Sequence, residues 1–205
     1  MKKTIVACLM VVGCVAFAGR KEDIAAAVAK GVKYLAAQQA EDGHFSDPQM
    51  PALTALPLWA MVRGGEGRTE GAKKAAAFVL KTQRPDGGFY VPKPGRGGSG
   101  LGNYNTSVCV SALFESGHAP TKAILDARTY IAGSQLTGDD TMAGGFGYDR
   151  ASRRRMADLS NTSYALDAMR RTEGVEDLRP KGQKRADLNW EQAIKFVTRL
   201  QESEG

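Results

Sequence analysis

The sequence contains little cysteine and little histidine. Among its 205 residues are three cysteines and two histidines. Cys8 and Cys14 lie in an apolar stretch at the start of the chain, so the rest of the chain holds only Cys109. One thiol cannot form an internal disulfide. We therefore expect side-chain packing, and not covalent cross-links, to stabilise the fold.

The sequence also lacks a long apolar run. The run from Thr4 to Ala18 is too short to cross a bilayer comfortably, since a membrane-spanning helix needs about 20 apolar residues. Lys2 and Lys3 precede this run, and Ala16-Phe17-Ala18 places small residues at the two positions that a signal peptidase reads. These features predict a signal peptide at residues 1–18, an exported chain at residues 19–205, and no membrane span.

A second interpretation of this stretch stays open. Val11-Val12-Gly13-Cys14 resembles a bacterial lipobox, in which the cysteine becomes lipidated. Apolar residues continue past Cys14, where a lipoprotein usually turns polar, so we favour cleavage and a secreted or periplasmic protein. The alternative is a membrane-anchored lipoprotein held by a lipid on Cys14.

A strong excess of charge is absent as well. The formal net charge is +6, and about +4 remains without Lys2 and Lys3. The basic residues form no groove pattern and are not interleaved with aromatic residues, as they are in many nucleic-acid sites. We therefore expect a solvated basic surface and no nucleic-acid partner.

What the sequence does contain is an internal repeat anchored on four glutamines. Each glutamine has an aromatic residue five positions earlier and a small residue eight positions earlier. Positions three and four apart share one face of a helix, so this spacing predicts one helix per repeat that buries that face. The glutamines are Gln39, Gln83, Gln135 and Gln201, the aromatic residues are Tyr34, Phe78, Tyr130 and Phe196, and the small residues are Gly31, Ala75, Ala127 and Ala193.

A glycine and a phenylalanine follow the first three glutamines. The pairs are Gly43 with Phe45, Gly87 with Phe89, and, after a short insertion, Gly145 with Phe146. Glycine takes the left-handed backbone conformation that a helix C-terminus needs, so we expect each glycine to end a helix. In the fourth repeat Gly205 is the last residue, two residues before the expected aromatic. This spacing favours a chain that is a piece of a longer gene product.

A second helix is expected after each turn. Thr54, Thr106 and Thr162 open similar apolar segments, and Asn105 and Asn161 are candidate N-caps. No segment shows the alternation typical of strands, so the fold class is all-α. Helices are expected near 22–39, 52–63, 70–83, 105–116, 121–135, 161–172 and 189–202. They form helical hairpins at about 22–64, 70–117 and 121–173, with a fourth beginning at 189–205, and such hairpins stack on their neighbours.

These repeats resemble the glutamine-tryptophan repeats of squalene and terpenoid cyclases, with phenylalanine in place of tryptophan. The runs from Lys30 to Phe45, from Gly144 to Tyr148 and from Ala157 to Thr162 carry the resemblance. The last two are similar to exported prenyltransferase and squalene-cyclase repeat proteins of bacteria. The resemblance implies an α/α toroid, in which inner and outer helices form concentric barrels around an apolar cavity. About three and a half hairpins would make only an incomplete arc.

The resemblance does not by itself imply catalysis, because fold and activity separate readily. Squalene-hopene cyclases protonate an alkene with an aspartate of an Asp-x-Asp-Asp motif, which this sequence lacks. The nearest pair, Asp139-Asp140, has no preceding partner aspartate and is expected in a solvated loop. Protein prenyltransferases hold zinc with an aspartate two residues before a cysteine, but Ser107 precedes Cys109. We expect Cys109 in the core, no metal and no cofactor.

Four aromatic residues are candidates for ligand contact on the concave face: Trp59, Tyr104, Tyr148 and Tyr164. An aromatic ring stacks well on an isoprenoid or a sugar, although aromatic residues at helical spacing more often belong to a core.

Three functions are consistent with these observations. We favour a noncatalytic exported binding or interaction module whose concave face holds an apolar, isoprenoid-like ligand or a protein partner. The first alternative is a terpenoid cyclase or prenyltransferase whose catalytic residues lie C-terminal to this chain. The second is a polysaccharide-active toroid enzyme, which needs a basic catalytic residue in a groove.

Overall fold

The computed structural model describes residues 2–92, 100–150 and 155–201, with side chains from residue 20 onward. Within these ranges the secondary structure is helical, and β pairing is limited to two isolated bridges, Gln83 with Phe89 and Phe146 with Asp158. The expected all-α class is therefore confirmed. The chain divides into two compact units, Met1–Gln38 and Gln39–Gly205.

The first unit is the helix α1 (Lys2–Ala37). It begins well before residue 22, where a helix start was expected, and it continues without a break across the predicted cleavage point after residue 18. The signal peptide and its cleavage stay predictions. Among the helices of the described ranges, none is long and apolar enough to cross a membrane.

The second unit contains the other helices of the described chain. They are α2 (Ala52–Arg63), α3 (Glu70–Lys81), α4 (Gly102–Ser116), α5 (Thr121–Ala132), α6 (Leu159–Arg171), the 3-10 helix η1 (Glu173–Leu178) and α7 (Trp190–Arg199). The expected helices after residue 50 are all present, and η1 was not expected. The helices α3, α5 and α7 end two or three residues before their glutamines, so these glutamines lie in the turns.

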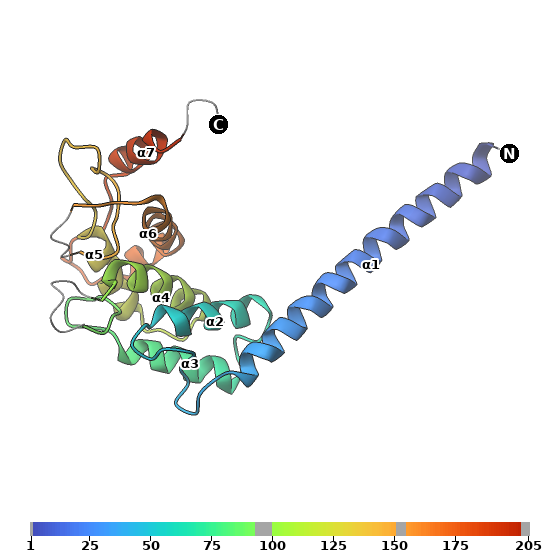
Figure 1. The fold of residues 1–205 in the computed structure, drawn as a ribbon, viewed down its shortest axis with the longest axis horizontal. Coiled ribbons are helices and arrows are strands. Elements are labelled where there is room, and N and C mark those ends of the chain that lie inside the picture. The colour runs from blue at the N-terminus through green and yellow to red at the C-terminus, as the bar shows by residue number, and fades with distance from the viewer. Residues whose placement is uncertain (1, 93–99, 151–154, 202–205) are drawn as a thin grey trace. The chain divides into compact units, whose positions relative to one another are not determined.

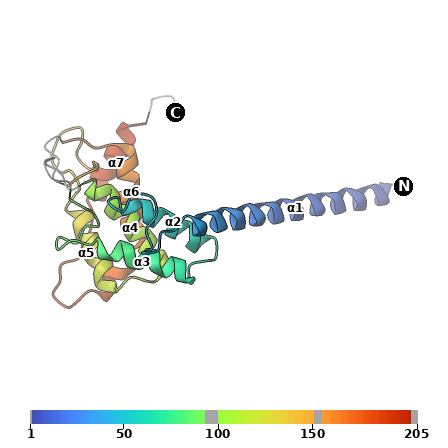
Figure 2. The same cartoon turned by 60° about the horizontal axis from the view of Figure 1, so that its bottom comes forward.

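The helices of this unit alternate between two layers (Figures 1 and 2). In one layer, α4 lies between α2 and α6 and contacts both. In the other, α3 packs against α2 and α4, and α5 packs against α4 and α6. We call α2, α4 and α6 the inner layer. The alternation agrees with stacked hairpins, whereas a toroid stays a prediction.

The inner-layer helices α2 and α4 run in the same direction. The backbone N–H of Ala52, at the start of α2, donates to Oδ1 of Asn105 in the first turn of α4 at 3.0 Å. At the other end, Nη2 of Arg63 donates to the carboxylate of Glu115 at 2.7 Å. Contacts of start with start and end with end require parallel helices.

The core confirms most of the expected helix stripe. Ala75, Ala127 and Ala193 have no exposed surface, which lets neighbouring helices approach closely. Tyr130 and Phe196 are buried, and Phe78 is half-buried. The first repeat departs from the expected stripe, because Gly31 and Tyr34 on α1 are exposed. Cys109 is fully buried on α4, as its apolar neighbours predicted.

The expected N-caps were wrong. At the start of α6, the carboxylate of Asp158 accepts from the backbone N–H of Asn161 at 2.8 Å, so Asp158 is the cap. The helix α4 begins after Leu101, whose own side chain makes no capping hydrogen bond. Asn105 instead bridges two segments, since its Nδ2 donates to the carbonyl of Gly100 while its Oδ1 accepts from Ala52. The sequence did not distinguish a cap from a side chain that joins two inner helices.

The repeat glutamines tie each turn to the next hairpin. The amide Nε2 of Gln39 donates to the carbonyl of Gly43 at 3.0 Å and to that of Gly71, in α3, at 2.8 Å. The same pair of bonds joins Gln83 to Gly87 and Ala123, and Gln135 to Gly144 and Asn189. Each glutamine therefore holds successive hairpins together. Gln201 is exposed, and Gly205 lies outside the described residues.

The turn phenylalanines are buried and are held by the threonines of the following helix. The backbone N–H of Phe45 donates to Oγ1 of Thr54 at 3.0 Å. The same bond joins Phe89 to Thr106 at 2.9 Å and Phe146 to Thr162 at 3.0 Å. All three phenylalanines and all three threonines are buried, so these bonds satisfy polar groups that water does not reach.

The turn glycines lie at positive φ in tight space. Gly43 has φ of 98°, and Gly87 has φ of 90°. A Cβ atom on Gly87 would lie 2.3 Å from the carbonyl oxygen of Asp126 in α5. We expected these glycines to end the preceding helices, and this was wrong. Both glycines lie beyond the helix ends, in the turns.

In the third repeat the equivalent glycine is Gly144, one residue before the expected Gly145. Gly144 has φ of 94°, and its carbonyl accepts from Gln135. Gly145 lies against the ring of Phe196, where a Cβ would come within 2.8 Å of the ring carbon Cζ. The insertion changes the spacing between the glutamine and the glycine in this repeat. Spacing alone therefore could not decide which of the two adjacent glycines is the equivalent one.

Candidate functional site

Three of the four candidate aromatic residues gather at the starts of the inner-layer helices α4 and α6. The ring centroids of Tyr104 and Tyr164 lie 5.6 Å apart at an interplanar angle of 85°, which is an edge-to-face contact. Those of Tyr104 and Tyr148 lie 6.3 Å apart. We call Tyr104, Tyr148 and Tyr164 the tyrosine cluster. The sequence placed these residues in different repeats, and the fold brings them together.

The tyrosine cluster continues into exposed apolar residues. The antiparallel bridge between Phe146 and Asp158 sets a register that places Tyr148 opposite Met156. Both are more than half exposed, Tyr148 at 52% and Met156 at 62%. Leu159, the first residue of α6, is exposed as well. Large apolar side chains left in water at one place on a protein often mark a binding surface.

Buried polar atoms lie on the same helix starts as the tyrosine cluster. Oδ1 of Asn103, Oγ of Ser107 and Oδ1 of Asn161 are buried and have no hydrogen-bond partner among the described residues. Nδ2 of Asn103 donates to the carbonyl of Gly147 at 2.8 Å, which ties the start of α4 to the segment carrying Tyr148. Buried polar atoms are usually satisfied, so these three oxygens have hydrogen-bonding capacity left for a bound water or ligand.

Burial raises the pKa of the Tyr104 phenol above its ordinary value, and the neighbouring phenols of Tyr164 and Tyr148 raise that pKa further. The Tyr104 hydroxyl is therefore neutral at physiological pH. The carboxylates of the adjacent segments serve as caps: Asp149 accepts from the backbone N–H of Gly102 at 2.7 Å, and Asp158 accepts from Asn161.

Trp59, the fourth candidate, belongs to a different group at the ends of the inner-layer helices. The guanidinium carbons of Arg63 and Arg171 lie 5.4 and 5.0 Å from its ring centroid. Both arginines also bind the carboxylate of Glu115, and the hydrogen bond from Arg63 lowers the pKa of that carboxyl below its ordinary value. These cation–π contacts occupy the Trp59 ring, so it is a weaker candidate for ligand stacking than the tyrosines.

Other residues weighed from the sequence show no catalytic arrangement. Asp140 pairs with Arg155, whose Nε lies 2.9 Å from Oδ2, and both side chains are about half exposed. Burial raises the pKa of the Cys109 thiol well above its ordinary value, which disfavours a thiolate. In the described part of the chain, no group of three or more histidine, cysteine or acidic side chains is placed to hold a metal ion.

The comparisons with known proteins give one short match. Squalene–hopene cyclase from Alicyclobacillus acidocaldarius is 40% identical to this chain over 42 residues, which make up 20% of this chain and 7% of the cyclase. No model of a known protein family matches the chain. No solved structure matches it either. The match and the all-helical fold together point to a cyclase-like helical repeat family and to nothing finer.

Tyr90 provides a test of the electrostatics of the second hairpin. Burial, followed by the hydrogen bond to Asp86 at 2.7 Å, raises the pKa of the Tyr90 phenol from 10.0 to about 12. Between these two values the unfolded chain loses this proton and the folded chain keeps it. The free energy of unfolding therefore falls as pH rises through this window.

We expect Tyr90→Phe to reduce that fall. Urea unfolding at about pH 9 and at about pH 11 measures it, because lysine titration affects both proteins alike and cancels in the difference. An equal fall in both proteins would contradict the raised pKa.

Proposed function

We propose that this chain is a cyclase-like repeat protein that binds an apolar, isoprenoid-like ligand at the tyrosine cluster without transforming it. The exported location predicted from residues 1–18 is part of the proposal. A protein partner on the same surface is the other outcome of the binding test.

The observation that carries the proposal is the tyrosine cluster itself. Three rings from two helices and one loop converge, and Tyr148 with Met156 opposite it leaves apolar surface exposed there. An apolar chain that covers this surface removes it from water, at a gain of about 25 cal/mol for each Å². The phenol hydroxyls also offer hydrogen bonds to a terminal hydroxyl of such a chain.

The hydrogen bonds around the cluster favour binding over catalysis. A carboxyl group that protonates an alkene must be neutral and must have its proton free to donate. Asp149 and Asp158 both accept hydrogen bonds from backbone N–H groups at helix starts, so their carboxyl oxygens are already engaged in a structural role. The second candidate function, a terpenoid cyclase or prenyltransferase with its catalytic groups outside this chain, is favoured by the short match to squalene–hopene cyclase.

The test is equilibrium binding of geranylgeraniol to the full chain, with gas chromatography of the recovered lipid. We expect saturable binding and unchanged geranylgeraniol. Tyr148→Ser should weaken binding roughly tenfold or more, since a buried aromatic side chain contributes about 1.5–3 kcal/mol. Tyr34→Ser is the matched control, because Tyr34 is also exposed but lies in the first unit.

Equal affinities of the two variants would remove the cluster from consideration as the site. A new terpenoid product would refute the noncatalytic function and support the cyclase alternative. Absence of saturable binding, together with a pulled-down protein that Tyr148→Ser releases, would replace the lipid with a protein partner.

A further inference from the structure

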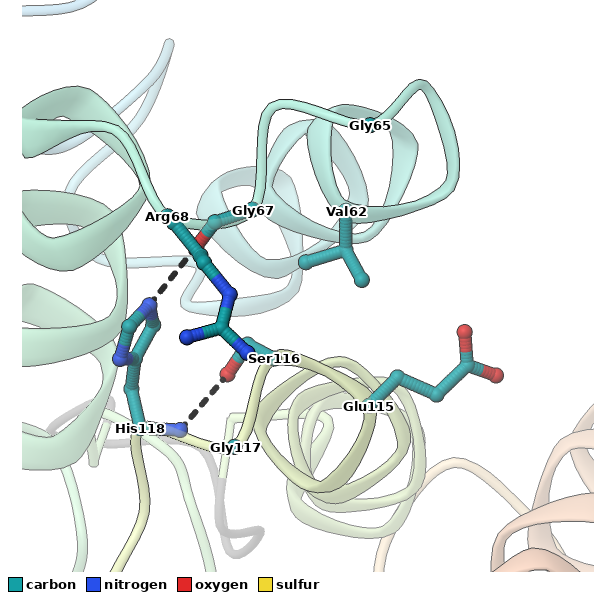
Figure 3. A pocket seen from close by; sticks show the side chains of 8 residues that line it. All are labelled: Val62, Gly65, Gly67, Arg68, Glu115, Ser116, Gly117 and His118. Atoms are coloured by element: carbon teal, nitrogen blue, oxygen red, sulfur yellow. Dashed lines mark hydrogen bonds between the residues drawn. The ribbon is translucent and has the colours of Figure 1, made fainter.

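A second site candidate lies at the other end of the inner layer from the tyrosine cluster. It is a pocket of about 420 Å³ between the C-terminal ends of α2 and α4 (Figure 3). This volume lies within the range of about 300–1,000 Å³ that small-molecule sites occupy. The lining residues are Val62, Gly65, Gly67, Arg68, Glu115, Ser116, Gly117 and His118.

Arg68 supplies an uncommitted positive charge to this pocket. Its guanidinium group extends between the loop that carries Gly67 and the loop that carries Gly117 (Figure 3). Among the described residues it takes part in no hydrogen bond or ion pair. A guanidinium group has five N–H donors in a planar fork, and that fork matches the two oxygens of a carboxylate or a phosphate.

His118 is held in one orientation beside Arg68. Its ring Nε2 lies 2.8 Å from the carbonyl oxygen of Gly67. A carbonyl only accepts, so Nε2 carries the hydrogen and Nδ1 stays available to a ligand. The backbone N–H of His118 donates to Oγ of Ser116, whose hydroxyl donates to the carbonyl of Leu113 at 2.8 Å. These bonds hold the wall of the pocket in place.

The acidic residue of the lining does not neutralise Arg68. The side chain of Glu115 points away from Arg68 and His118 in Figure 3. Its carboxylate is instead bound by Arg63 at 2.7 Å and by Arg171. Because two arginines already bind this carboxylate, Glu115 does not neutralise Arg68. Arg68 has no ion-pair partner in the described chain.

We propose that this pocket binds the oxyanion of a small organic molecule, a phosphate monoester or a carboxylate, through Arg68 with His118 beside it. The C-terminal ends of α2 and α4 carry partial negative charge, which disfavours a bound anion. This effect is screened by salt and falls off within one turn. A forked, charge-assisted pair of hydrogen bonds from arginine is short-ranged and stronger. The polar lining also distinguishes the chemistry of this pocket from that of the tyrosine cluster, which is apolar.

The test is isothermal titration calorimetry of the full chain with glycerol 2-phosphate and with citrate. We expect one saturable site, and the tighter of the two probes identifies the oxyanion. Arg68→Gln should weaken binding about tenfold or more, because two charge-assisted hydrogen bonds are lost. Arg68→Lys should retain part of the affinity, since it keeps the charge and loses the fork.

Arg84→Gln is the matched control. Arg68 lies just before α3, and Arg84 is an exposed arginine just after α3. Arg84 does not line the pocket. Equal weakening by Arg68→Gln and Arg84→Gln would overturn the proposal in favour of unspecific attraction to a basic surface. Absence of saturable binding of both probes to the unmodified chain would overturn it as well. Circular dichroism of each variant establishes that the fold is unchanged.

Discussion

Arg128→Met is expected to lower the free energy of unfolding by about 3–5 kcal/mol, the usual cost of leaving one member of a buried ion pair without its partner. Arg128 lies on α5 and Glu176 on η1, and Nε of Arg128 is 2.7 Å from Oε1 of Glu176. Their side chains are 2% and 1% exposed. Methionine is shorter than arginine but close to it in volume, so it fills most of the space and the loss measures mainly the charge and the hydrogen bonds.

Arg128 does more than pair with Glu176. Its Nη1 donates to the carbonyl of Met169 at 2.6 Å and to Oγ1 of Thr172 at 2.7 Å, and its Nη2 donates to the carbonyl of Ala186 at 3.1 Å. One side chain therefore satisfies acceptors at the end of α6 and in the loop before α7. The other carboxylate oxygen of Glu176 has no hydrogen-bond partner among the described residues, so Glu176 depends on Arg128 for its stabilisation.

Urea unfolding followed by circular dichroism measures this loss, with two controls. Lys122→Met removes an exposed ion pair from the same helix, since the Lys122 side chain is 83% exposed, and should change stability little. The double variant Arg128→Met, Glu176→Met should be more stable than Arg128→Met alone, because it removes the stranded charge as well. A double variant less stable than Arg128→Met would show that burial of an uncompensated charge is not the cause.

The sequence predicted the hairpin repeat well because the repeat is local. The spacing from Ala127 to Tyr130 to Gln135 spans a few helical turns, and residues so close in sequence report on one helix face. The same local pattern located Gly43 and Gly87, whose backbone conformation favours glycine. It misplaced the third glycine at Gly145, because the insertion before it broke the fixed spacing.

The sequence could not predict contacts between repeats. Arg128 occupies the position of Ala76 in its own repeat, counted from the glutamine, and its burial depends on Glu176, 48 residues away. Arg68 and His118 come from two separate loops and meet only where α2 and α4 end side by side. The tyrosine cluster was named residue by residue, but its assembly depends on the segment from Phe146 to Asp158 folding back on itself.

Gly87→Ala is expected to destabilise the protein much more than Gly65→Ala, although the two glycines have nearly the same φ, 90° and 88°. An alanine in the left-handed region costs about 1–2 kcal/mol at either position. At Gly65 a Cβ atom would meet nothing within 4 Å, so that conformational cost is the whole effect. At Gly87 the Cβ would lie 2.3 Å from the carbonyl oxygen of Asp126, and backbone must move.

That movement separates the turn from α5. The side-chain amide of Gln83 donates to the carbonyl of Gly87 in this turn at 3.1 Å and to the carbonyl of Ala123 in α5 at 2.8 Å. A displaced turn therefore disturbs both hydrogen bonds. Overpacking of this kind adds roughly 1–3 kcal/mol to the conformational cost. Thermal and urea unfolding of both variants measure the difference. If Gly87→Ala and Gly65→Ala lose equal stability, the turn glycine is required for its φ alone, and the close approach between hairpins does not constrain the repeat.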